Sequence, residues 1–195
     1  MSNSTKDEIK KKALLLFASQ GYDGTSMKDI AMQVGIKTPS IYAHFNGKEE
    51  LLFSIYEELA NEYMDLINEM MNAAEDMSEE AQLYYIFERY ITYYMKYPEI
   101  QSFWNQITVF TPPQLKETFF DHVTNYNYYT QDKIEKIFIE GIEKGVFRNG
   151  NPKQMALSFR IMMEGVFNYM MVVQEISDDN FIRDLWTDLW LGLKK

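Results

Sequence analysis

The sequence predicts an all-α fold with about nine helices. Apolar residues recur at three- and four-residue spacing along almost the whole chain, as they do on the buried face of a helix. Strand signals are nearly absent, because no segment keeps an alternation of apolar and polar residues for long between turn residues. Glycine and proline separate the periodic segments into discrete helices.

Two helices are expected in the first 35 residues. The first ends at Gly21, and its apolar face consists of Ile9, Ala13, Leu16 and Phe17. The second begins at Ser26, which is expected to form a capping box with Asp29, and it ends at Gly35.

A very short third helix follows. Thr38 is its predicted N-cap, Pro39 takes the first helical position, and residues 46–48 end it. Ile41 and Phe45 share its buried face. Because a tight, glycine-containing turn joins the second and third helices, the pair is typical of a helix-turn-helix, whose second member enters the DNA major groove.

The rest of the chain is also expected to be helical. The remaining helices are predicted at residues 48–74, 78–97, 99–110, 114–144, 152–174 and 178–193. Residues 1–48 are predicted to form a DNA-binding domain, and residues 49–195 a helical ligand-binding and dimerisation domain.

The charge of the protein is unevenly distributed. The net charge is −10 over 195 residues, which at first argues against a nucleic-acid partner. Residues 1–48, however, contain seven lysines and four acidic residues, a net charge of +3, so the remaining 147 residues carry −13. Phosphate binding depends on lysine and arginine, so the N-terminal residues are the part suited to DNA.

Several classes of function are disfavoured by composition. The chain has no cysteine and two histidines, which excludes disulfides, thiolate nucleophiles and a histidine-rich metal site. No pair of nucleophile and base stands out, so we expect no enzyme activity, no metal and no cofactor. No run of roughly 18 to 20 apolar residues and no signal-peptide cleavage site is present, which predicts a cytoplasmic protein without a membrane partner.

The N-terminal segment resembles the DNA-binding domain of the TetR family of bacterial transcriptional repressors. The resemblance covers "ALLLFASQGYDGTSMKDIAMQVGIKTPSIYAHFNGKEELL", residues 13–52. The matching positions include Phe17, Gly21-Tyr22, Thr25, Ile30-Ala31, Val34-Gly35-Ile36, Ser40-Ile41-Tyr42, His44-Phe45 and the stretch from Lys48 to Leu51. The resemblance implies an all-helical homodimer with a C-terminal ligand-binding lobe that leaves its operator when an effector binds.

The predicted DNA-binding residues are Thr25, Ser26, Lys37, Thr38, Ser40, Tyr42, Ala43, His44 and Lys48. Their hydroxyl groups can reach phosphates or base edges, the lysines supply positive charge, and Ala43 can contact a thymine methyl. Thr25 and Ser26 lie at a helix N-terminus, which favours a phosphate. Alternatively, Tyr42 and His44 are partly buried surface residues. Lysines 10–12 form either a solvated face or one that attracts phosphates.

Residues 78–175 are rich in Tyr, Phe, Trp and Met, on helices whose apolar faces are broad. Such helices are buried on more than one side or line a cavity, and the resemblance implies a cavity for a hydrophobic or aromatic effector. The predicted ligand-binding residues are Phe87, Glu88, Tyr90, Ile91, Tyr94, Phe103, Trp104, Met163 and Phe167. The alternative is ordinary core, with Glu88 facing solvent and Glu164 paired with Arg160.

The last two helices are predicted to form the dimer interface. Gly165 in mid-helix costs about 1 kcal/mol relative to alanine, which indicates a close backbone approach. The predicted interface residues are Gly165, Tyr169, Phe181, Leu185, Trp186 and Leu189. Two helices from each chain then form a four-helix interface with two-fold symmetry.

The sequence therefore predicts a ligand-responsive repressor that binds a palindromic double-stranded DNA operator as a homodimer. The alternative is a helical carrier or scavenger of hydrophobic small molecules that has lost DNA binding.

Overall fold

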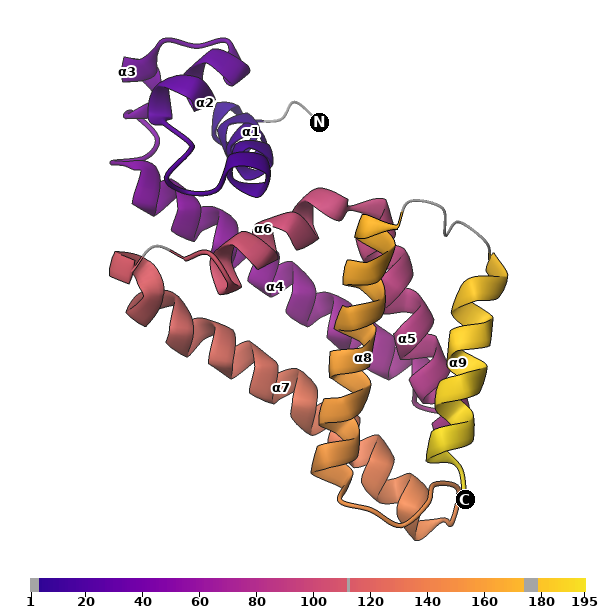
Figure 1. Ribbon diagram of the computed structural model, residues 1–195. Helices are drawn as coiled ribbons and strands as arrows, with labels where there is room; N and C mark the ends of the chain where they lie inside the picture. The colour runs from indigo at the N-terminus through magenta and orange to yellow at the C-terminus, as the bar shows by residue number, and fades with distance from the viewer. Residues whose placement is uncertain (1–3, 112, 174–178) are drawn as a thin grey trace. The chain divides into compact units, whose positions relative to one another are not determined.

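The computed structural model describes residues 4–111, 113–173 and 179–195, and this part of the chain is all-α, as predicted (Figure 1). Its helices are α1 (Thr5–Gln20), α2 (Met27–Val34), α3 (Thr38–Ile41), α4 (Lys48–Ala74), α5 (Glu79–Lys96), α6 (Pro98–Thr108), the 3-10 helix η1 (Pro113–Leu115), α7 (Lys116–Glu143), α8 (Pro152–Val172) and α9 (Asp179–Leu193). Apart from α3, the observed bounds lie within a few residues of those predicted. The predicted termini at Gln174 and Asp178 lie outside the described residues. Within the described ranges, no helix is both long and apolar enough to span a bilayer.

The chain divides into two compact units. Unit 1 comprises Met1–Met64 and Tyr97–Thr124, and unit 2 comprises Asp65–Lys96 and Asn125–Lys195. Helices α4 and α7 each contribute to both units. Unit 1 extends beyond the predicted DNA-binding domain of residues 1–48, because α6 packs against α1.

The second helix has the caps that the sequence predicts, and the first ends at Gly21 as predicted and has an N-cap, Ser4, that was not predicted. The Ser4 hydroxyl accepts a hydrogen bond from the Asp7 backbone N–H at 3.2 Å and caps α1. In α2, Ser26 and Asp29 form the predicted capping box. Gly35 ends α2 with φ 78°, a left-handed conformation that glycine adopts without steric cost. The predicted apolar face of α1 is buried.

Helix α3 is shorter than predicted and begins differently. Thr38 is already helical, and the N-cap is Lys37, which has φ −75°, ψ 142° and no side-chain capping hydrogen bond. The prediction of Thr38 as N-cap is therefore wrong, because the extended cap position falls one residue earlier. After Ile41 the chain continues as a turn, in which the His44 and Phe45 backbone N–H groups both donate to the Ile41 carbonyl.

The interior of unit 1 contains an aromatic cluster. The buried Tyr56 ring meets the rings of Trp104 and Phe119 edge-on, with centroid distances of 5.4 and 4.9 Å. The Phe53 ring stacks on Phe119 at 4.5 Å. These contacts connect α4 with α6 and α7 inside unit 1.

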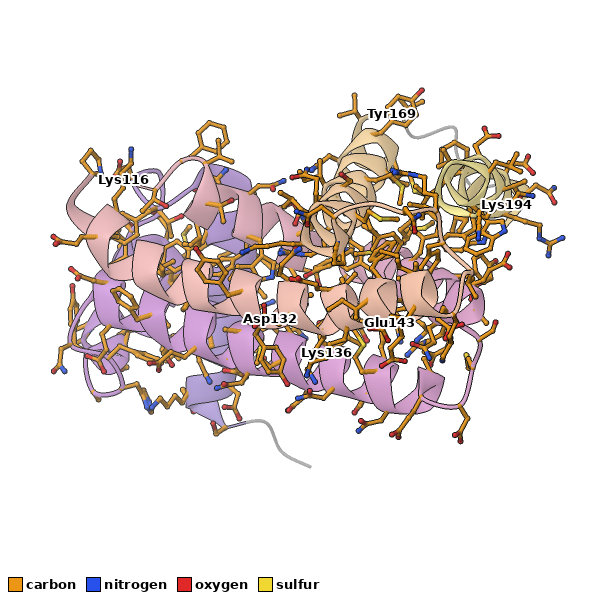
Figure 2. The ribbon with its side chains drawn as sticks, turned by 90° about the horizontal axis from the view of Figure 1, so that it is seen from below. Lys116, Asp132, Lys136, Glu143, Tyr169 and Lys194 are labelled. Carbon is orange, nitrogen blue, oxygen red and sulfur yellow. The ribbon has the colours of Figure 1, made fainter. Side chains whose placement is uncertain are left out.

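Unit 2 is built around α5, against which both α8 and α9 pack (Figure 1). The Trp186 ring of α9 lies 5.4 Å from Tyr84, 5.9 Å from Phe87 and 6.5 Å from Phe159. The outer side of α7 carries exposed charged residues, among them Asp132 and Lys136 (Figure 2). Unit 2 thus has an aromatic interior and, along α7, a charged surface.

Candidate DNA-binding surface and effector site

Helix α3 and the turn that follows it have one buried and one exposed side. Ile41 and Phe45 are buried in unit 1. Ser40, Tyr42 and Ala43 are exposed, and Tyr42 leaves 51% of its surface accessible. An exposed tyrosine and serine beside a firmly anchored isoleucine form a surface that can contact phosphates or base edges.

Other predicted contacts surround this surface. Lys37 is exposed, whereas Thr38 and His44 are half-buried. Ser26 is exposed at the N-terminus of α2, where its hydroxyl accepts a hydrogen bond from the Asp29 N–H at 3.1 Å. Ser26 lies at the start of α2, and Lys37 and Thr38 lie at the start of α3, where unpaired backbone N–H groups favour an anion, whereas His44 lies beyond the end of α3.

The Thr25 side chain faces the interior. It is 1% exposed, and its hydroxyl donates a hydrogen bond to the Gly21 carbonyl at 2.8 Å. Its predicted role as a phosphate contact is therefore corrected to a structural role, in which the hydroxyl closes the turn between α1 and α2.

The Lys48 ammonium also turns toward the protein. It donates hydrogen bonds to the Tyr22 carbonyl at 2.6 Å and to the Thr25 carbonyl at 2.9 Å. It lies 3.9 Å from the centroid of the Tyr22 ring. Burial lowers the pKa of Lys48, and the nearby Asp23 carboxylate opposes that change. The Lys48 prediction as a DNA contact is not supported by this orientation.

The N-terminal lysines differ in their surroundings. Lys10 forms an ion pair with Glu58, and Lys12 lies 3.7 Å from Glu8. The Lys6 ammonium lies 5.2 Å from the centroid of the Phe45 ring. Since exposed ion pairs contribute little and exchange readily, these lysines remain able to attract phosphates, although Lys10 and Lys12 have acidic neighbours.

The predicted effector residues fall into two groups. Phe103 and Trp104 belong to unit 1, and the others belong to unit 2. In unit 2, the Tyr94 ring lies 4.8 Å from Tyr90 and 5.5 Å from Phe167. Phe87, Ile91 and Met163 are buried as well. The unit 2 residues therefore form one apolar, aromatic region.

Glu88 lies at the margin of this region. It is half-buried, and the Tyr84 hydroxyl lies 3.4 Å from its carboxylate, within hydrogen-bond range. Burial, and next the Glu88 charge, raise the pKa of Tyr84. Glu164 lies 3.7 Å from Arg160 and is exposed, as expected for the pairing that the sequence offered as its alternative.

Helix α8 carries an apolar stripe on its exposed side. Gly165 is exposed, and an added Cβ there would meet no atom of this chain within 4 Å. Tyr169 projects from the same helix (Figure 2). Sequence reasoning missed the other members of the stripe, which are Leu157, Ile161 and Val172, 40%, 59% and 82% exposed. Their three- and four-residue spacing was the available signal.

The predicted interface residues of α9 are less exposed than those of the α8 stripe. Phe181, Leu185 and Leu189 are half-buried. Trp186 is 7% exposed and packs inside unit 2, so this chain itself covers most of its surface. An apolar stripe in a sequence does not show which helix covers a tryptophan.

Comparison with known proteins agrees with this architecture. A family model described as "Bacterial regulatory proteins, tetR family" matches residues 9–55. The biofilm operon icaADBC HTH-type negative transcriptional regulator IcaR of Staphylococcus aureus (strain Newman) is 31% identical over 145 residues, covering 69% of this chain and 70% of IcaR.

The chain belongs to the TetR family of bacterial regulatory proteins. It is a DNA-binding transcriptional regulator, and the helix-turn-helix of α2 and α3 lies within the matched residues.

Solved structures share the fold. The ketosteroid transcriptional regulator KstR2 of Mycobacterium tuberculosis has a TM-score of 0.80 at 17% identity, covering 100% of this chain and 97% of KstR2. AibR, solved with isovaleryl coenzyme A and operator DNA, has a TM-score of 0.76 at 20% identity, covering 96% of this chain and 98% of AibR.

Proposed function

We propose that this regulator is a repressor that binds a palindromic operator as a homodimer and leaves it when a hydrophobic or aromatic effector binds. The observation that carries the proposal is the two-sided segment of α3 and the turn after it, in which Ile41 and Phe45 are buried and Ser40 and Tyr42 are exposed. The buried side chains hold this segment in place, so that the exposed ones can be presented to a groove. The negative regulator IcaR, at 31% identity, supports repression.

The exposed stripe of α8 supports the homodimer. Ile161, Gly165 and Val172 recur along one side of the helix, and the glycine leaves room for a close backbone approach. One short recognition helix offers few contacts, whereas two helices about 34 to 36 Å apart read a palindrome. A second copy of the chain is the partner that satisfies both requirements.

The aromatic interior of unit 2 supports the effector class. Tyr90, Tyr94, Phe167 and Met163 offer ring faces and a polarisable thioether, which suit flexible apolar or aromatic ligands. AibR, a structural neighbour, was solved with an acyl thioester. Helix α4, which contributes residues to both units, is the proposed lever between effector and DNA.

Selection of duplexes from a random pool tests the proposal. The protein should enrich one palindrome, and the double substitution Ser40→Ala with Tyr42→Ala should abolish the enrichment. Asn61→Ala, at an exposed position of α4 in unit 1, is the matched control and should leave it unchanged. Recovery of no duplex from a folded protein that retains a hydrophobic ligand would indicate the carrier instead.

A further inference from the structure

We propose that Lys48 is a positioning residue, an internal brace that fixes the N-terminus of α2 for phosphate binding without contacting DNA itself. The inference rests on the proposed function, because it concerns how the proposed DNA-binding surface keeps its geometry. It also assigns Lys48 a different role from the phosphate contact that its sequence position suggests.

The brace joins the first residue of α4 to the turn before α2. The Lys48 ammonium donates to the carbonyls of Tyr22 and Thr25, at 2.6 and 2.9 Å. The Tyr22 carbonyl also accepts from the Thr25 N–H at 3.3 Å, and the Thr25 hydroxyl donates to Gly21. One cation thus holds two carbonyls of a turn that is already closed on itself.

The Tyr22 ring strengthens this arrangement. It lies 3.9 Å from the Lys48 ammonium and stacks against Phe17 of α1 with a centroid distance of 6.2 Å. A lysine ammonium has three N–H donors. Two of them are used by carbonyls, and the ring face lies beside the same cation, so a phosphate would have to displace contacts that the fold uses.

The braced turn leads directly into the predicted phosphate site. Thr25, whose carbonyl Lys48 holds, is followed by Ser26, the N-cap of α2. The first N–H groups of a helix bind an anion only when they point at it. Loss of the Lys48 contact would therefore weaken DNA binding by releasing the α2 N-terminus, without removing a charge from the protein–DNA interface.

Salt dependence separates a brace from a phosphate contact. Each phosphate neutralised by a protein contributes about 0.9 to the slope of log affinity against log salt concentration, so two symmetric contacts contribute about 1.8. Lys48→Met should weaken binding of the selected duplex about ten-fold at every salt concentration while leaving the slope unchanged. Lys37→Met, at an exposed lysine beside α3, is the comparison, because loss of a direct phosphate contact there should reduce the slope of log affinity against log salt concentration. A slope reduced by about 1.8 in Lys48→Met would overturn the inference.

A double-mutant cycle with Tyr22 adds a second readout. Tyr22→Leu removes the ring face and keeps the apolar contact with Phe17. Tyr22→Leu leaves the Tyr22 and Thr25 carbonyls in place, so Lys48→Met should still weaken binding in this background, but by less than in wild type, because the ring face no longer contributes. Equal losses in the two backgrounds would show that the ring face contributes nothing and would overturn that part of the inference. Circular dichroism should confirm that each variant remains helical.

Thermal unfolding keeps the inference separate from the proposed function. Lys48→Met should lower the melting temperature of the DNA-free protein by several degrees, whereas Lys37→Met should not. If the wild-type protein recovers no duplex, the proposed function fails while this measurement still tests the brace. Equal melting temperatures of Lys48→Met and wild type would refute the brace whether or not the protein binds DNA.

Discussion

Thr25 and Ser26 are adjacent and carry the same chemical group, yet their hydroxyls face different surroundings. The Thr25 hydroxyl donates to the buried turn at Gly21, and the Ser26 hydroxyl caps α2 at the surface. Removing a buried hydroxyl leaves its acceptor carbonyl without a hydrogen-bond donor. When an exposed hydroxyl is removed, water takes its place in the hydrogen bond. The consequences of mutation should differ accordingly.

Thr25→Val should lower the free energy of unfolding by about 1 to 3 kcal/mol, because it removes the donor to the Gly21 carbonyl while keeping the shape of the side chain. Ser40→Ala, at an exposed position of α3, should change it by less than about 0.5 kcal/mol. Urea denaturation monitored by circular dichroism measures both. Equal unfolding free energies for the two variants would contradict the inward role of Thr25.

The sequence predicted which residue types surround the DNA-binding surface, but not the direction of every side chain. Ser40 and Tyr42 are exposed as expected, because their spacing from Ile41 and Phe45 determines their face. The contact of Lys48 with the Tyr22 carbonyl was not predicted, because Tyr22 lies 26 residues earlier in the chain. Such a contact depends on tertiary packing, which local patterns do not encode.

At the level of elements, an ion pair joins the start of α5 to the end of α7. The Glu79 carboxylate is buried and accepts a hydrogen bond from the Lys144 ammonium. This hydrogen bond, ahead of other causes, lowers the pKa of Glu79 below its ordinary 4.5 and raises the pKa of Lys144 above its ordinary 10.5. The pair therefore stabilises unit 2 only within a definite pH range.

The stabilisation by Glu79 should be fully present above pH 4.5 and should disappear as the pH falls through its lowered pKa. That from Lys144 should be complete below pH 10.5 and should disappear as the pH rises through its raised pKa. Glu79→Gln should therefore be less stable than wild type at pH 7, and the difference should shrink in acid. Chemical denaturation across the pH range measures this, with Lys144→Met as the matched variant. A constant difference between Glu79→Gln and wild type would contradict the prediction.

The exposed stripe of α8 yields a prediction about assembly. Ile161→Glu should raise the dimer dissociation constant at least about 100-fold, because a carboxylate would be buried without a partner. Thr92→Glu, at an exposed position of α5, introduces the same charge away from the stripe and should leave the dimer intact. Sedimentation equilibrium measures both constants. A dimer unaffected by Ile161→Glu would place the interface elsewhere.

The positions of the helices were predictable because the residues that cap a helix act through nearby residues. Ser26, Asp29 and Gly35 bound α2 through hydrogen bonds and a backbone angle that involve neighbouring residues only. The start of α3 was misplaced by one residue, since Lys37 adopts the extended cap conformation without a capping side chain. For Trp186, the covering surface comes from α5 and α8, so the sequence could not distinguish core from interface.

At the scale of the whole molecule, the distribution of charge determines how strongly DNA affinity depends on salt. Residues 1–48 carry +3 within a chain of net charge −10. Operator affinity should therefore depend steeply on salt, falling by about a thousand-fold between about 50 and 200 mM if the dimer neutralises about six phosphates. Fluorescence anisotropy with the selected duplex measures the slope. An affinity that does not change over this range would contradict the assignment of phosphate contacts to residues 1–48.

The inward-facing Lys48 has a consequence for the search along a chromosome. Because this cation is bound to the Tyr22 and Thr25 carbonyls, residues 1–48 have one fewer positive charge available for non-specific binding to DNA. Sliding along a duplex relies on such indiscriminate attraction. The regulator should therefore reach its target mostly by repeated collisions from solution, with brief stays at every incorrect site.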